Sequence, residues 1–214
     1  MAEEQQTPAD LRYAAFFADG EFDWKRRKRD CIQFLRIHPS TNETLVAGGF
    51  FASYQTAQKH TRLWSRKRLI RIVATMTGDN GRPAHVYGRW RPNAVEHDVL
   101  LSRFFALSPD WHVERGGQLE RNADAVCWIG QQKAYVELDT GSMSLRKVRR
   151  RWDSYLECDG IVLVVTTSEK RLDRLRETST AIGDYFLITT LDRLAGEPRG
   201  YIWSDINGDP CRIG

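Results

Sequence analysis

The 214-residue sequence predicts an α+β or α/β protein built from two domains, and three observations support this prediction. Segments with helical periodicity alternate with short runs of β-branched and aromatic residues, which indicates mixed secondary structure. Pro92 interrupts the pattern, so we place a domain boundary there, with residues 1–91 in the first domain and 92–214 in the second. Charge divides at the same point, because residues 25–91 are strongly basic while the remainder is net acidic.

Composition excludes several classes of protein. No segment approaches the ~20 apolar residues that span a bilayer, and the polar, acidic N-terminus lacks the apolar core of a signal peptide. We therefore expect a cytoplasmic protein without a membrane partner. The four cysteines (Cys31, Cys127, Cys158, Cys211) are far apart and form no CxxC pair, so reduced, buried thiols are favoured over a zinc site.

The first domain shows the element order of a winged helix-turn-helix domain. A helix is expected over 24–37, a short second helix over 41–47, and a longer basic helix over 54–68 that Ser53 caps. Two β-rich segments, 69–76 and 85–90, flank a turn-forming TGDNGRPA sequence and predict a hairpin. In such domains the third helix enters the major groove of DNA and the hairpin contacts the flanking backbone.

The pattern of the third helix assigns candidate DNA contacts. Its apolar stripe includes Ala57, Thr61 and Trp64, and its basic residues fall largely on the other face. The side chains expected to reach bases are Gln55, Gln58, Lys59 and Arg62, and those expected to hold phosphates are Arg66, Lys67, Arg68, Arg71, Arg82 and Arg89. We also assign the basic run at 25–29 to phosphate contact, since cations are unfavourable at a helix N-terminus. The alternatives are a protein-binding platform and a solvated basic surface without a partner.

The second domain shows the order α-β-β-β-α-β-α-β, which implies a mixed sheet flanked by helices. The expected helices are 94–107, 145–156 and 171–181, and the expected strands are 111–115, 123–129, 134–138, 160–166 and 185–190. The strand at 160–166 is almost entirely aliphatic, which is typical of a strand covered on both faces.

Three carboxylates are expected on one patch of this sheet. If the turn between strands 123–129 and 134–138 centres on Gly130 and Gln131, Asp124 lies opposite Glu137, and Asp139 shares the face of Glu137. Carboxylates gathered in this way repel each other unless a divalent cation lies between them, so the sequence predicts a Mg²⁺ or Mn²⁺ site at these three residues.

Further residues are candidates for the chemistry of this site. Lys147, near the start of an arginine-rich helix, is the cation expected to approach a reacting phosphate, and His97 is a possible ligand or base. Arg149 and Arg150 on the same helix are candidate DNA contacts. The alternatives are that Asp124 begins a strand and binds a neighbouring backbone amide, and that Glu137 and Asp139 face solvent on an edge strand and pair with Arg146 or Arg149.

The pattern resembles the replication-relaxation family of plasmid and mobile-element proteins, which is related to plasmid mobilisation relaxases. The segments that carry this likeness are TRLWSRKRLI, HVYGRW, EHDVLLSRFF, WHVER, NADAV and YVELDTGS, within residues 25–165. The order αβββαβ, with Asp124 before one strand and Glu137 late in its partner, also resembles the PD-(D/E)xK restriction-endonuclease-like fold. Two positions depart from that motif: Ala123 replaces the usual Pro, and Asp139 replaces the Lys that activates water in typical nucleases.

The leading hypothesis is a DNA-binding protein with a metal-dependent endonuclease or relaxase-like domain that nicks or cleaves plasmid or mobile-element DNA. The alternative is a non-catalytic DNA-binding replication or regulatory factor that retains the nuclease-like domain as a scaffold. A third hypothesis is a protein-interaction module whose basic surface meets an acidic partner. A homodimer is plausible, because a short recognition helix usually contacts one half-site.

Overall fold

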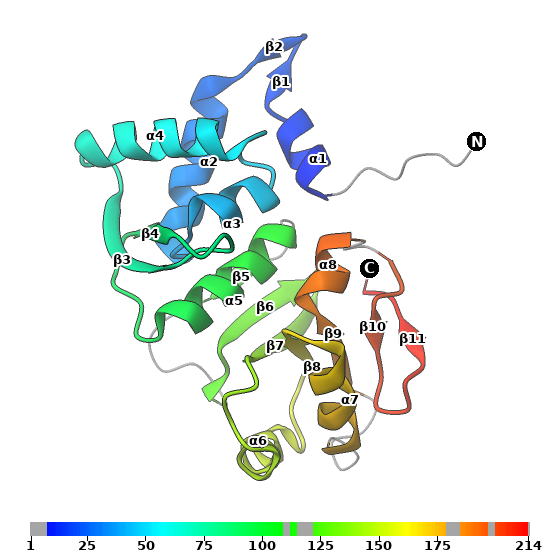
Figure 1. Ribbon diagram of the computed structural model, residues 1–214. Coiled ribbons are helices and arrows are strands. Elements are labelled where there is room, and N and C mark those ends of the chain that lie inside the picture. Colours follow the sequence, from blue (N-terminus) through cyan, green and yellow to red (C-terminus); the bar gives the residue numbers. More distant parts are fainter. Residues whose placement is uncertain (1–7, 109–111, 115–121, 179–184, 197–199, 214) are drawn as a thin grey trace. The chain divides into compact units, whose positions relative to one another are not determined.

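The computed structural model describes residues 8–108, 112–114, 122–178, 185–196 and 200–213, and it divides into two compact units, residues 1–109 and 110–214 (Figure 1). The protein contains helices and a mixed β-sheet, which confirms the predicted α+β class. Within the described parts of the chain, no helix is long and apolar enough to cross a membrane.

The first unit contains the three predicted helices and the predicted hairpin. Helix α1 (Pro8–Ala14) and the short strands β1 (Phe17–Ala18) and β2 (Glu21–Phe22) precede α2 (Trp24–Ile37), α3 (Asn42–Ala47) and α4 (Tyr54–Arg66). The side chains of Asp23, Thr41 and Ser53 accept hydrogen bonds at the N-termini of α2, α3 and α4 respectively. Helix α4 ends two residues earlier than predicted, because Arg68 adopts a left-handed backbone conformation (φ 57°) that no helix accommodates.

Strands β3 (Arg71–Thr77) and β4 (Pro83–Gly88) form the antiparallel hairpin. Ser40 pairs with Tyr87 of β4 through two backbone hydrogen bonds of 2.9 and 2.8 Å, and this ties the α2–α3 connection to the hairpin. The core beneath is apolar and largely aromatic, and it includes Leu35, Phe51, Trp64 and Tyr87.

Helix α5 (Val95–Leu107) belongs to the first unit, whereas the sequence placed it after a boundary at Pro92. The contacts of α5 explain the difference, because it packs against α3 and β3. Seven of its side chains, from Val99 to Leu107, are buried, and Ser102 donates a hydrogen bond to the carbonyl of Asp98. The contact-based division therefore lies between Pro109 and Asp110.

The second unit is organised around a seven-stranded mixed sheet in the order β11-β10-β9-β8-β7-β6-β5. Its strands are β5 (His112–Glu114), β6 (Ala125–Ile129), β7 (Gln132–Asp139), β8 (Ile161–Thr166), β9 (Phe186–Thr190), β10 (Trp203–Ser204) and β11 (Pro210–Cys211). Strands β7, β8 and β9 are parallel, and the outer pairs on both sides are antiparallel. The two C-terminal strands and helix α8 (Leu191–Gly196) were not predicted, since their segments are short.

Helices α6 (Leu145–Trp152) and α7 (Glu169–Thr178) contact each other and cover one face of this sheet (Figure 1). Helix α6 is shorter than the predicted helix 145–156, because a 3₁₀ turn, Asp153–Tyr155, replaces its last part. The end of the predicted helix 171–181 lies outside the described residues.

The core of the second unit lies between these helices and the sheet. Val148, Trp152 and Tyr155 pack with Leu172 and Leu175 on the sheet residues Tyr135, Val162 and Phe186. Glu137 and Asp139 alternate with Leu138 on β7 and so share the face of Tyr135.

Candidate carboxylate site and nucleic-acid interface

The β6–β7 hairpin brings Asp124 and Glu137 together, as the sequence predicted. Ile129 pairs with Gln132 and Ala125 with Val136, so the turn consists of Gly130 and Gln131, and Gly130 has the positive φ (61°) that glycine adopts readily. Asp124 immediately precedes β6, and its Oδ2 accepts a hydrogen bond of 2.9 Å from the backbone amide of Leu138. This bond fixes the Asp124 carboxylate beside that of Glu137.

Arg151, the last of the four arginines on α6, lies between these two carboxylates. Its Nη2 is 2.9 Å from Oδ1 of Asp124 and 2.9 Å from Oε2 of Glu137, and it also donates to the carbonyl of Asn122 at 3.0 Å. Burial opposes the charge on Arg151, but the nearby Glu137 and Asp124 outweigh it and raise the pKa of the guanidinium. Arg151 is therefore a firmly charged counterion to both carboxylates.

Tyr155 completes this cluster. Its buried hydroxyl donates a hydrogen bond to Oε1 of Glu137. Burial and the adjacent carboxylate raise the pKa of the phenol, which keeps Tyr155 neutral and able to donate. Each oxygen of Glu137 thus has a donor, Tyr155 on one side and Arg151 on the other.

Asp139 does not join this cluster, which corrects the prediction of a single three-carboxylate patch. Arg171 of α7 binds Asp139 with two hydrogen bonds of 2.9 Å, from Nε to Oδ1 and from Nη2 to Oδ2. The backbone amide of Gly141 donates to the same carboxylate at 2.6 Å, and Arg171 also donates to the carbonyl of Met143 at 2.8 Å. This bidentate pairing satisfies the charge of Asp139 and fixes the turn after β7.

Two further predicted catalytic residues lie on helices α6 and α5. Lys147 is exposed on α6, and within the described chain no ion pair connects it to Asp124 or Glu137. His97 lies on α5 in the first unit, where its Nδ1 is 3.9 Å from Oδ1 of Asp98. Their catalytic roles stay predictions.

The Asp124–Glu137 pair nevertheless has the geometry to hold one cation. Oxygens of both side chains converge on a single nitrogen of Arg151, and the guanidinium occupies the point at which a divalent ion would have to bind. Oxygen ligands of Mg²⁺ lie at 2.0–2.1 Å, and such an ion would need the guanidinium to withdraw and the carboxylates to close in. No group of three metal-ligating side chains is found among the described residues. The donor set therefore fits one ion in competition with Arg151.

The predicted DNA-binding residues of the first unit are accessible to solvent. Ala57, Thr61 and Trp64 of α4 point inward, as predicted. Gln58 is half-buried, and the other candidates are exposed, namely Gln55, Lys59, Arg62, Arg66, Lys67, Arg68, Arg71, Arg82 and Arg89. Arg149 and Arg150 are likewise exposed on α6 of the second unit. No acidic residue lies between Ser53 and Thr77, so the exposed charges of α4 and β3 are all positive, while Asp79 is exposed in the turn that follows β3.

One cation of the basic run at 25–29 has a structural position that the sequence did not predict. Arg27 is 2% exposed, and its guanidinium carbon lies 3.7 Å from the ring centre of Trp24 and 4.8 Å from the rings of Phe22 and Phe51. Its Nε has no hydrogen-bond partner within the described structure. Burial lowers the pKa of Arg27 to about 10. The assignment of the whole run to phosphate contact is therefore wrong for Arg27, which is a core residue.

Comparisons with models of protein families, with curated proteins and with solved structures give no significant match.

Proposed function

We propose that the protein binds double-stranded DNA through α4 and the β3–β4 hairpin. The observation that carries this proposal is the solvent-facing side of α4, which has no acidic residue and exposes Lys59, Arg62 and Arg66. The opposite side of the helix is buried and includes Trp64. Electrostatic attraction to phosphates supplies most of the affinity of such a surface and makes it dependent on salt.

The arrangement around α4 supports a winged helix. Three helices are followed by a hairpin, and the pairing of Ser40 with Tyr87 adds a further bridge to that hairpin. In a domain of this kind α4 would enter the major groove, with Gln55, Gln58 and Lys59 facing base edges. Arg82, in the turn between β3 and β4, would meet the flanking backbone.

Replacing Arg62 and Lys67 together by alanine is expected to weaken duplex binding at least tenfold. Each phosphate contact contributes about 0.9 to the slope of log K against log salt, so the slope should fall by about 1.8. Fluorescence anisotropy of a labelled duplex at several salt concentrations measures both quantities. The matched control is Lys170→Ala with Arg174→Ala, which removes two exposed charges from α7. Equal affinity and equal slope in the two double variants would contradict the proposal.

The convergence of Asp124 and Glu137 on one point favours a second function, metal-dependent nicking or cleavage of the bound DNA. Tyr155 and the amide of Leu138 hold the two carboxylates in place, and Arg151 is positioned to turn from them toward a phosphate. A bound Mg²⁺ or Mn²⁺ would activate water and neutralise charge on the phosphate. The resemblance to replication-relaxation proteins suggests plasmid or mobile-element DNA as the substrate.

The same cluster also supports the non-catalytic alternative, since Arg151 already neutralises both carboxylates. Incubation of supercoiled plasmid with the protein and Mg²⁺ or Mn²⁺ distinguishes the two. A nuclease is expected to nick the plasmid, and Asp124→Asn and Glu137→Gln should each abolish nicking while leaving duplex affinity unchanged. Absence of nicking, or equal nicking by all three proteins, would favour a DNA-binding factor that keeps this unit as a scaffold.

A further inference from the structure

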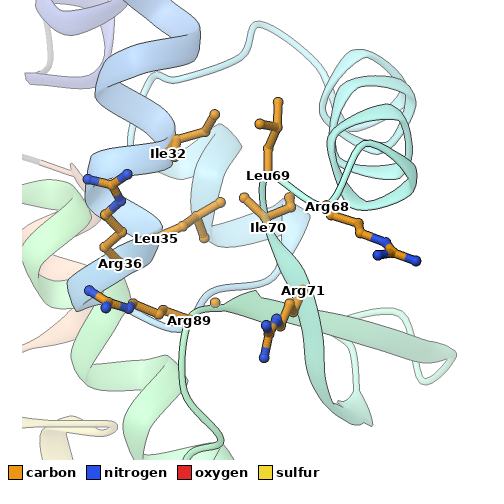
Figure 2. Close-up of a pocket in the computed structure, with 9 residues that line it drawn as sticks. Ile32, Leu35, Arg36, Arg68, Leu69, Ile70, Arg71 and Arg89 are labelled. Carbon is orange, nitrogen blue, oxygen red and sulfur yellow. The ribbon is translucent and has the colours of Figure 1, made fainter.

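A cleft in the first unit lies between the C-terminal half of α2 and the connection from α4 to β3, and its volume is about 490 Å³ (Figure 2). Ile32, Leu35 and Arg36 line it from α2, and residues 68–71 line it from the connection and the start of β3. Gly88 and Arg89, at the end of β4, complete the lining. None of the α4 residues proposed to face bases takes part.

The charge of this cleft is entirely positive. Figure 2 shows the guanidinium groups of Arg36 and Arg89 on the α2 side and that of Arg71 near the start of β3, while Arg68 points away. All four arginines are exposed, and no acidic residue lines the cleft. Across the described parts of the protein, none of the four makes an ion pair, in contrast to Arg103, Arg151 and Arg193. These guanidinium groups are thus available to an external anion.

The cleft continues along α2 into a second hollow of about 450 Å³, which shares Ile32, Arg36 and Leu69 with it. Lys25 and Lys28 extend the positive charge along this second hollow. Positions 25 to 36 span about 16 Å at 1.5 Å per residue. The two hollows therefore form one elongated basic groove, which suits a chain of anions better than a single ion.

The floor of the second hollow is largely apolar, and apolar side chains also form part of the floor of the first. Leu35 and Ile70 are buried beneath it, and Leu69 stands at its edge with 42% of its surface exposed. A floor of this kind can pack against the sugar or base of a nucleotide while the arginines at the rim bind its phosphates. Each hollow has the volume of a small-molecule pocket, which ranges from about 300 to 1,000 Å³, and so accommodates one or two nucleotides but not a duplex.

We propose that this groove binds a single strand of nucleic acid, with phosphates at Arg36, Arg71 and Arg89. The inference adds to the proposed function a second site, which shares only the base of the β3–β4 hairpin with the duplex site, so one protein would hold both a duplex on α4 and an unpaired strand along α2. Charged grooves that follow the backbone are the usual means of binding single strands without sequence preference.

The test uses labelled oligothymidylate of twelve nucleotides and a labelled duplex, with the full-length protein and Arg36→Ala combined with Arg89→Ala. We expect single-strand binding to weaken at least tenfold and its salt slope to fall by about 1.4, since each phosphate contact on a single strand contributes about 0.7. Duplex binding should weaken by a clearly smaller factor, because Arg36 is not a candidate duplex contact and Arg89 is one of several candidate phosphate contacts. Both side chains are exposed, so the fold should be retained, and circular dichroism checks this.

The matched comparison is Arg62→Ala with Lys67→Ala, which should weaken duplex binding and leave single-strand binding within twofold. If this variant binds the duplex as tightly as the unsubstituted protein does, the duplex proposal is contradicted, but the proposal for the groove is not. The groove assignment would be overturned by three results: no binding of oligothymidylate, equal loss of both ligands in the Arg36 and Arg89 variant, or equally effective competition by polyglutamate. The last would identify an acidic polypeptide as the occupant.

Discussion

Arg151→Ala is expected to lower the free energy of unfolding by about 3–5 kcal/mol, the usual cost of removing one partner from a buried ion pair. The variant leaves the side chains of Asp124, 12% exposed, and Glu137, 5% exposed, without the nitrogen that lies 2.9 Å from both. Two carboxylates held side by side then repel each other in a poorly solvated environment. Urea denaturation followed by circular dichroism measures the loss.

The control for this experiment is Arg150→Ala on the exposed side of the same helix, which should change stability by less than about 0.5 kcal/mol. A mutant cycle isolates the electrostatic part. In a background of Asp124→Asn and Glu137→Gln, the Arg151 substitution should cost about 1 kcal/mol or less, because no charge is left unpaired. Equal costs in the two backgrounds would show that Arg151 acts by packing.

Removal of Arg151 also tests the fit of a cation. Mn²⁺ or Mg²⁺ should stabilise Arg151→Ala more than the unsubstituted protein, since the ion no longer competes with a guanidinium. A ligand at one hundred times its dissociation constant stabilises by about 2.7 kcal/mol, which recovers most of the expected loss. If these ions raise the unfolding midpoint of neither protein, the carboxylate pair is a structural ion pair rather than a metal site.

Arg27→Ala is expected to destabilise the first unit by about 2–4 kcal/mol, through the cavity it leaves and the loss of contacts with three aromatic rings. Arg27→Met should cost less than about 1.5 kcal/mol, because it fills the space without burying a charge. Arg26→Ala, which removes an exposed cation on the same helix, should be almost neutral. If Arg27 is a core residue, thermal unfolding should show the largest loss of stability for Arg27→Ala, a smaller loss for Arg27→Met and almost none for Arg26→Ala.

A second measurement separates the charge of Arg27 from its bulk. The ring of His60 lies against that of Trp24, with ring centres 5.1 Å apart and a tilt of 35° between the rings. Burial, followed by the charges of Arg27 and Lys59, lowers the His60 pKa. Arg27→Met should therefore raise the pKa of His60 toward its ordinary value, as followed by NMR titration. Duplex affinity should stay unchanged in this variant. A large loss of duplex affinity would indicate that Arg27 contacts phosphate after all.

Much of the local structure follows from the sequence. Helix α2 has the predicted bounds, and α4 begins at the predicted cap, Ser53, because capping and amphipathic periodicity depend on neighbouring residues. The β6–β7 register also follows, since a two-residue turn at Gly130 and Gln131 and a buried face permit only one alignment. The proximity of Asp124 and Glu137 was predictable for the same reason.

Contacts between distant segments required the tertiary structure. Hydrophobic periodicity showed that α5 has an apolar face, but not that this face packs against α3 and β3 rather than in the second unit. The sequence likewise contains several arginines that could pair with Asp139. The parallel pairing of β7 with β8 decides which of them does. That pairing places the start of α7, with Arg171, at the same sheet edge as Asp139.

The sequence by itself determined the succession of elements, the hairpin register and the positive surface of α4, because each depends on residues close together in the chain. Only the tertiary structure decided which cations are neutralised and which are available. Arg151 and Arg171 are held by carboxylates, Arg27 is enclosed by aromatic rings, and Arg36 and Arg89 line an acid-free groove. The physical reason is that a charge is compensated by whatever packs against it, and packing joins segments far apart in sequence.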